Sequence, residues 1–168
     1  YEAYFEAENI ATQAISTMKG EAIEFGKNLA KMLFTFSLFD RSIENKMFYS
    51  SGEFTVTLKG KGVGGRNQEM LLGFLIQECK MIIDNTREYL EFIENYSYCL
   101  VSCAFDGIEG NSPAMGAIID SSTIGKIQDI IGIETIEQLM NYLIDLANQN
   151  NSFELFSKLN DALIVGYT

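Results

Sequence analysis

The chain has 168 residues, 47% of them hydrophobic, and a formal net charge of −11. This length and composition suffice for one folded unit with a substantial core. The negative charge argues against a nucleic-acid partner, which would need a basic surface, and no apolar run is long enough to predict a membrane span.

Two residue types limit the chemistry. The chain has no histidine, which removes histidine-based acid–base catalysis and the nucleophiles that depend on it. Its cysteines, Cys79, Cys99 and Cys103, are an odd number and are expected to be buried thiols in a reducing cytoplasm. The remaining groups suit positioning and electrostatic stabilisation, on which phosphoryl transfer depends.

Strands alternate with helices along the chain, which predicts an α/β fold, a layered sheet flanked by helices. The elements expected in the first part are the end of a helix at 1–9, a strand at 10–16 and a helix at 20–36. A polar connector at 37–45 predicts a boundary between a first segment, residues 1–46, and a second, residues 47–168.

The second segment contains most of the expected elements. The strands are expected at 47–50, 53–58, 98–104, 115–120 and 162–165. The helices are expected at 67–83, 121–132, 135–148 and 153–159, with a helix-like insertion at 85–95. The apolar run YCLVSCA, residues 98–104, predicts a central strand that is buried on both faces.

The most informative stretch is KGKGVGGRNQE, residues 59–69, between an expected strand and an expected helix. A glycine turn at a helix N-terminus can leave free backbone N–H groups for an anion. Arg66 favours a bound phosphate or carboxylate, because a guanidinium at a helix N-terminus is otherwise electrostatically unfavourable. The alternative is a turn that needs glycine for its backbone angles and lysine for solubility.

A second candidate position follows the run at 98–104. Asp106 comes directly after it, where α/β sheets bind their ligands. Asp106 or Glu109 could hold Mg²⁺ or a substrate hydroxyl, although Asp-Gly is equally common in plain turns. Glu53 either belongs to the same site or is only a charge on an edge strand.

These residues resemble the C-terminal MOFRL domain of the type 2 glycerate kinases. The matching blocks are SSGEFTVTLKGKGVGGRNQE (50–69), LVSCAFDGIEG (100–110), GAIID (116–120) and DALIVGYT (161–168). The similarity covers about residues 48–168, and MKGEAIEFGKNLA (18–30) is similar to the end of the family's N-terminal, Rossmann-like domain. The chain departs from the family pattern at Phe105, where the family has threonine, and at Glu109, where it has aspartate.

The resemblance implies a cytoplasmic enzyme that transfers the γ-phosphate of ATP to glycerate, usually at the 2-hydroxyl, with Mg²⁺, in a cleft between two domains. It implies Arg66 and Asp106 as catalytic residues: Arg66 would clamp the substrate carboxylate or the transferring phosphate, and Asp106 would orient substrate or metal. The implied substrate-binding residues are Ser51, Gly52, Glu53, Lys61, Gly64, Gly65 and Asn67.

The implied partners are glycerate, ATP and the family's N-terminal kinase domain, which carries the catalytic lysine and most nucleotide contacts. The chain alone is therefore expected to be inactive, and whether the protein forms a homodimer is left open. The alternative function is that of a non-catalytic α/β module that binds a small anion or a partner protein through the same loop.

Overall fold

The structure is a computed structural model that describes residues 11–14, 17–39 and 45–166. The helix end expected at 1–9 lies outside the described residues. The helices of the described part are α2 (Ala22–Phe39), α3 (Arg66–Ile83), α4 (Arg87–Asn95), α5 (Thr123–Ile131), α6 (Ile136–Asn148) and α7 (Ser152–Leu159). The strands are β1 (Ala11–Ala14), β2 (Met18–Glu21), β3 (Lys46–Tyr49), β4 (Gly52–Thr55), β5 (Cys99–Cys103), β6 (Gly116–Asp120) and β7 (Ala162–Leu163).

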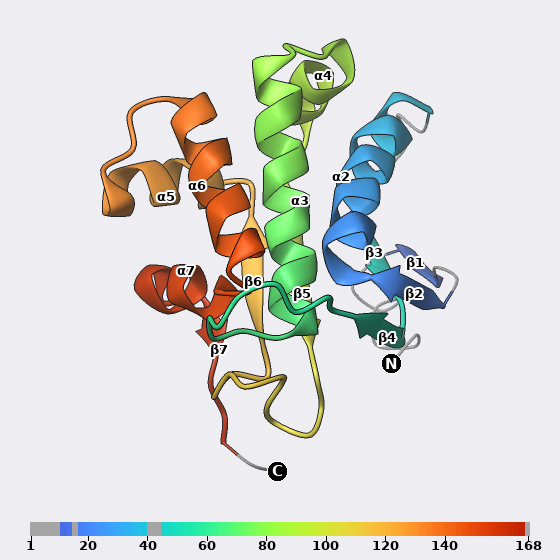
Figure 1. Ribbon diagram of the computed structural model, residues 1–168. Coiled ribbons are helices and arrows are strands. Elements are labelled where there is room, and N and C mark those ends of the chain that lie inside the picture. Colours follow the sequence, from blue (N-terminus) through green and yellow to red (C-terminus); the bar gives the residue numbers. More distant parts are fainter. Residues whose placement is uncertain (1–10, 15–16, 40–44, 167–168) are drawn as a thin grey trace.

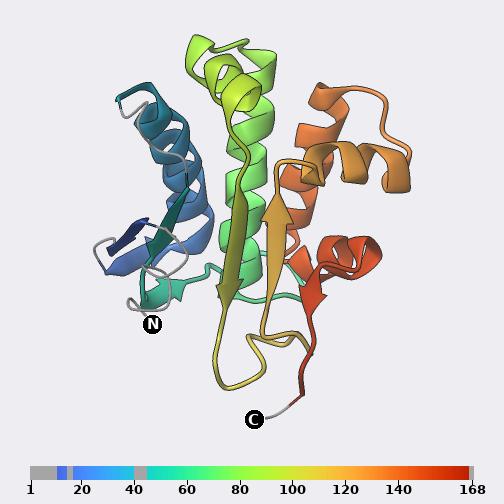
Figure 2. The same cartoon turned by 180° about the vertical axis from the view of Figure 1, so that it is seen from behind.

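Helix α3 occupies the centre of the molecule. Figure 1 and Figure 2 show it between α2 on one side and α6 on the other, with β5 and β6 along its back. Every residue from Gln68 to Cys79 is buried, because neighbours cover the helix on all sides. The predicted α/β fold is confirmed, and its helices begin and end within a few residues of the predicted positions.

The strands form three small sheets. β1 pairs with β3 and β2 with β4, both in parallel, while β5, β6 and β7 form an antiparallel sheet in that order. The prediction missed β2, because the Gly20-Glu21 pair at its end resembles a helix start. The two parallel pairs lie beside α2, away from the antiparallel sheet (Figure 1).

The prediction that residues 98–104 form a central strand buried on both faces is wrong. β5 is an edge strand of the antiparallel sheet in the described chain, and Val101 is 50% exposed. One face packs on α3 through Leu100 and Ser102, and Figure 2 shows no helix in front of the other. Antiparallel sheets often leave one face uncovered, and an apolar run alone does not reveal it.

The cysteines differ in their burial, contrary to the prediction that all three are buried. Cys79, on the central helix α3, is buried. Cys99, on the open face of β5, is exposed, and Cys103 is intermediate. The prediction therefore holds only for the cysteine on α3.

Two glycines let α2 and α3 pack backbone against backbone. A Cβ atom added to Gly26 would lie 1.8 Å from the carbonyl oxygen of Met70, and one added to Gly73 would lie 2.1 Å from that of Ile23. This contact joins the two segments on either side of the predicted boundary at residue 46. That boundary remains a prediction, but the segments share one core.

A buried carboxylate lies in an aromatic cluster at the other end of α3. Glu78 is 1% exposed and accepts hydrogen bonds from the hydroxyls of Tyr98 (2.6 Å) and Tyr89 (3.3 Å). Phe34 packs edge-on against Tyr89, with ring centroids 5.0 Å apart. Burial raises the pKa of Glu78 from 4.5 to about 7, since the hydroxyl bonds only partly offset the loss of hydration.

We expect Gly26→Ala and Gly73→Ala each to lower the free energy of unfolding by about 2 kcal/mol or more, because the helices must separate to admit a methyl group. Urea denaturation of each variant measures the effect. Gly125→Ala is the matched control: it lies in α5 with open space around its Cβ position, and should raise stability by about 0.5 kcal/mol through helix propensity. Equal effects in the three variants would contradict the close contact.

Glu78 should make the stability depend on pH. Because the pKa of Glu78 is higher in the folded than in the unfolded state, its contribution to stability is fully present below pH 4.5. That contribution is lost as the pH rises to about 7. Glu78→Gln stays neutral, so its stability relative to the unsubstituted chain should rise by about 2–3 kcal/mol between pH 5 and pH 8. Urea denaturation across this range measures the difference, in which other titrating groups cancel. A difference independent of pH would contradict the buried, protonated state.

Candidate functional site

An open hollow of about 680 Å³ lies where the segment after β4, the start of α3 and the loop after β5 meet. We call it the glycine-loop hollow. Its lining includes the charged residues Lys61, Arg66, Glu69 and Asp106. Gly64, Gly65 and Glu109 also line it, so the structure brings together much of the predicted site.

The glycine loop, residues 59–65, is fastened to the turn between α6 and α7 by Asn150. The Oδ1 atom of Asn150 accepts hydrogen bonds from the backbone N–H groups of Lys59 (2.6 Å) and Gly60 (2.9 Å). Its Nδ2 atom donates to the carbonyl of Thr57 (3.2 Å) and to Glu69 Oε1 (2.8 Å). Asn150 adopts a positive φ of 52°, which asparagine tolerates better than most residues.

Two further asparagines complete the fastening. Asn151 Oδ1 accepts from the N–H of Val63 (3.1 Å) and Asn111 Oδ1 from that of Gly64 (2.9 Å). Asn111 Nδ2 also donates to the carbonyl of Gly62 (2.9 Å). The backbone N–H of Gly64, a predicted substrate-binding residue, is thus hydrogen-bonded within the protein.

The N-terminus of α3 is occupied by a carboxylate of the chain itself. Glu109, 4% exposed, accepts hydrogen bonds from the backbone N–H groups of Asn67 (2.6 Å) and Gln68 (3.0 Å) and from Gln68 Nε2 (2.8 Å). The expectation that these N–H groups are free for a ligand is therefore wrong at both positions. A helix N-terminus does attract an anion, and here the anion is Glu109.

Two consequences follow for Glu109. Burial raises its pKa, and the hydrogen bonds from Asn67 and Gln68 oppose the shift by stabilising the charged form. Both of its oxygens accept N–H bonds, so its role is that of a helix cap and not of an open metal ligand. Gly65 permits the approach, since a Cβ atom there would lie 2.4 Å from Glu109 Cγ.

Arg66, the first residue of α3, forms an ion pair with Glu53 of β4. The Arg66 Nη1 atom lies 2.5 Å from Glu53 Oε1, and the side chains of Arg66 and Glu53 are 41% and 78% exposed. The structure thus brings together two of the predicted site residues. The carboxylate of Glu53 is the anion that compensates the charge of Arg66 at the helix N-terminus. A pair this exposed contributes about 1 kcal/mol or less.

The remaining predicted residues lie around the hollow or turn away from it. Asp106 is exposed and lines the hollow, in the turn after β5. Asn67 Oδ1 accepts a hydrogen bond from the hydroxyl of Ser102 (2.7 Å), so its side chain turns to β5. The backbone of Ser51 and Gly52 lies beside β2. The Ser51 carbonyl accepts a hydrogen bond from the Met18 N–H (3.2 Å), and Gly52 pairs with Met18.

The prediction overlooked Glu69 and Asn150. Glu69 lies within the KGKGVGGRNQE stretch but was treated as an ordinary helix residue, whereas it is 4% exposed and lines the hollow. Its burial could not be read from the sequence. Asn150 lies in a predicted turn, and its contact with a loop some ninety positions earlier has no local signal.

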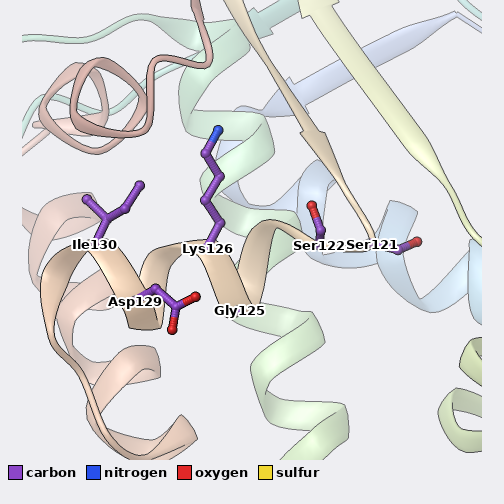
Figure 3. Close-up of a pocket in the computed structure, with 6 residues that line it drawn as sticks. All are labelled: Ser121, Ser122, Gly125, Lys126, Asp129 and Ile130. Carbon is purple, nitrogen blue, oxygen red and sulfur yellow. The ribbon is translucent and has the colours of Figure 1, made fainter.

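A second open hollow, of about 560 Å³, lies along α5, and its charged side chains do not converge on a common point as in a binding or catalytic site. Figure 3 shows its lining residues, with the side chains of Lys126 and Asp129 directed away from each other. Lys126 is already paired with Asp161, at 2.6 Å. The glycine-loop hollow is therefore the better candidate.

Two properties of the described part concern metals and membranes. Residues 11–14, 17–39 and 45–166 contain no cluster of three or more His, Cys, Asp or Glu side chains able to hold a metal ion. Within the same ranges, no helix combines the length and apolar character needed to cross a membrane.

The chain is similar to several glycerate kinases. It is 31% identical to the glycerate 2-kinase of Picrophilus torridus, over 91% of this chain and 32% of that protein. It is 32% identical to the D-glycerate 2-kinase of Thermotoga maritima, over 98% of this chain and 33% of that protein. The chain thus spans about a third of the length of these relatives.

Solved structures and a family model agree with these similarities. The crystal structure of the Thermotoga maritima glycerate kinase superposes with a TM-score of 0.68 at 25% identity, covering 98% of this chain and 35% of that one. A Pyrococcus horikoshii protein shares the fold, with a TM-score of 0.63 at 24% identity over 96% of this chain and 33% of that one. The model of the MOFRL family matches residues 46–168, which confirms the resemblance found in the sequence. With most of its length matched in this way, the chain belongs to the MOFRL family.

Proposed function

We propose that the chain supplies the substrate-side wall of an active site that transfers the γ-phosphate of ATP to glycerate, giving 2-phosphoglycerate. The observation that carries the proposal is the placement of Arg66, a half-exposed cation at the first residue of a buried helix and at the edge of the glycine-loop hollow. The names of the relatives, glycerate 2-kinase and D-glycerate 2-kinase, support this reaction.

Arg66 can exchange its present partner for a substrate. Its pair with Glu53 is exposed on both sides and therefore weak. A glycerate carboxylate or a transferring phosphoryl group can take the guanidinium from Glu53 and form two parallel hydrogen bonds to it. Glu53 thus holds the guanidinium in place until the substrate arrives.

The surroundings hold Arg66 in position. Glu109 caps the helix on which Arg66 lies, and Asn150 and Asn111 fix the loop that leads to it. Such preorganisation lets a cation stabilise developing charge without first having to be ordered. It suits phosphoryl transfer, which depends on placement and electrostatics and needs no histidine.

Asp106 is the residue that fits Mg²⁺ in this part of the site. It is an exposed carboxylate on the hollow, whereas the carboxylate of Glu109 is committed to α3. Magnesium ions often bind proteins through one or two carboxylates together with substrate phosphates, so the lack of a ligand cluster in the described residues is compatible with this role. When bound, the ion would neutralise phosphate charge.

The opposite wall, with the nucleotide contacts, would come from the two-thirds of the relatives that this chain does not match. The chain by itself should therefore show no turnover. The second candidate function is that of a non-catalytic module that binds a small anion through Arg66. It is favoured by the net charge of −11, because a half-exposed arginine stands out as an anion-binding group on a strongly acidic protein.

We expect Arg66→Ala to lower kcat/KM for D-glycerate about 100-fold or more, because it removes a charge-assisted contact to the substrate or transferring group. Arg66→Lys should recover only part of the activity, since an ammonium cannot form the paired hydrogen bonds of a guanidinium. The measurement is ADP formation from ATP with D-glycerate, in the complete natural protein that contains this chain.

Arg87→Ala is the matched control. Arg87 also forms an exposed pair, with Glu91 at 2.6 Å, but lies on α4 and does not line the hollow. It should leave turnover unchanged within about twofold, as expected for an exposed ion pair. Turnover that survives Arg66→Ala would remove Arg66 from the site. No turnover at all, with phosphate or glycerate still bound in an Arg66-dependent manner, would establish the second candidate.

A further inference from the structure

Glu69 is a buried carboxylate in the wall of the glycine-loop hollow. It is 4% exposed and lines the same hollow as Arg66 and Asp106. Glu69 follows Arg66 by three residues in α3, a spacing that places two side chains on the same side of a helix with Cβ atoms about 5–6 Å apart. A cation and a buried carboxylate therefore border the hollow together.

One oxygen of Glu69 is held by the side-chain amide of Asn150. Oε1 accepts a hydrogen bond of 2.8 Å from Asn150 Nδ2, and Asn150 is itself fixed by its bonds to Thr57, Lys59 and Gly60. The other oxygen, Oε2, has no donor among the described residues, yet it is not sealed from solvent. A largely buried carboxylate oxygen is stabilised by a hydrogen-bond donor, and a molecule bound in the hollow can supply one.

We propose that Glu69 is a substrate-binding residue that accepts a hydrogen bond from a hydroxyl group of the substrate. Arg66 binds the carboxylate of a hydroxy acid, and Glu69 binds a hydroxyl beside it, so that the hollow selects hydroxylated acids. This inference rests on the proposed function and identifies the residue that recognises the substrate hydroxyl.

The chemistry of the neighbours supports this assignment. Glu21 at the end of β2 and Glu109 on the loop before β6 face Glu69 with negative charge, and Lys59 faces it with positive charge. Burial is the largest cause that raises its pKa, and the bond from Asn150 opposes the shift. An O–H donor would relieve this cost, whereas a substrate carboxylate beside Glu69 would be repelled. The anion therefore binds at Arg66 and the hydroxyl at Glu69.

The test compares the binding of D-glycerate with that of propanoate, which keeps the carboxylate but has no hydroxyl. Calorimetric titration of the complete natural protein should show D-glycerate bound about tenfold or more tightly than propanoate, as expected for a hydrogen bond to a charged acceptor. Glu69→Gln should lower this preference about tenfold, while weakening propanoate binding little. The measurement needs no turnover.

Glu78→Gln is the matched control, since it makes the same change at another buried glutamate of α3 that does not line the hollow. It should leave the preference for D-glycerate unchanged. If Glu69→Gln weakens both ligands equally, Glu69 only fastens the loop and the proposal is overturned while the proposed function stands. If D-glycerate does not bind in an Arg66-dependent manner, both are overturned.

A measurement on the unsubstituted protein keeps the test independent of folding defects in a variant. Because burial raises the pKa of Glu69, acidification that protonates this carboxylate should weaken the preference for D-glycerate over propanoate. The comparison is made only at pH values where both ligand carboxylates stay ionised, so that a general loss of binding affects the two ligands alike. A preference that is constant with pH in the unsubstituted protein would count against Glu69.

Discussion

The carboxylate of Glu109 at the N-terminus of α3 is the interaction on which the site depends. It lies among the first N–H groups of the central helix, at distances of 2.6 and 3.0 Å, where the helix dipole favours a negative charge. The contact fixes the loop after β5 against the helix and places Arg66 at the edge of the hollow. Arg66 and Asp106 thereby line one hollow, although they come from segments forty residues apart.

The sequence was sufficient to predict the elements but not their environment. Helix α3 was predicted to within one residue, because a long apolar run follows a glycine-rich turn. The apolar run of β5 was correctly predicted as a strand and wrongly as a buried one, because an apolar run does not show whether a second layer covers it. Val101 and Cys99, on the open face, are exposed.

The glycine loop shows the same limit at the level of chemistry. A strand, a glycine turn and a helix N-terminus correctly indicate that an anion binds there. They cannot show whether that anion is a ligand or a side chain such as Glu109, because the answer depends on a contact across more than forty residues. The asparagines that take up the other amides of the loop are equally remote: Asn111, Asn150 and Asn151. Arg66 could be singled out from the sequence because its charge is unusual for its position in the helix, and its role in the site stays a prediction.

The buried glutamates of α3 and its cap differ mainly in the donors around them, and this difference decides what each can do. Glu109 has three N–H bonds and is satisfied within the protein as a cap. Glu78 accepts hydrogen bonds from two tyrosine hydroxyls in an aromatic cluster and does not line the glycine-loop hollow, so we expect its charge state to affect stability. Glu69 has the Asn150 amide and an oxygen without a donor among the described residues, beside an open hollow. Since a buried carboxylate is costly until its oxygens are satisfied, Glu69 is the one that a ligand can stabilise.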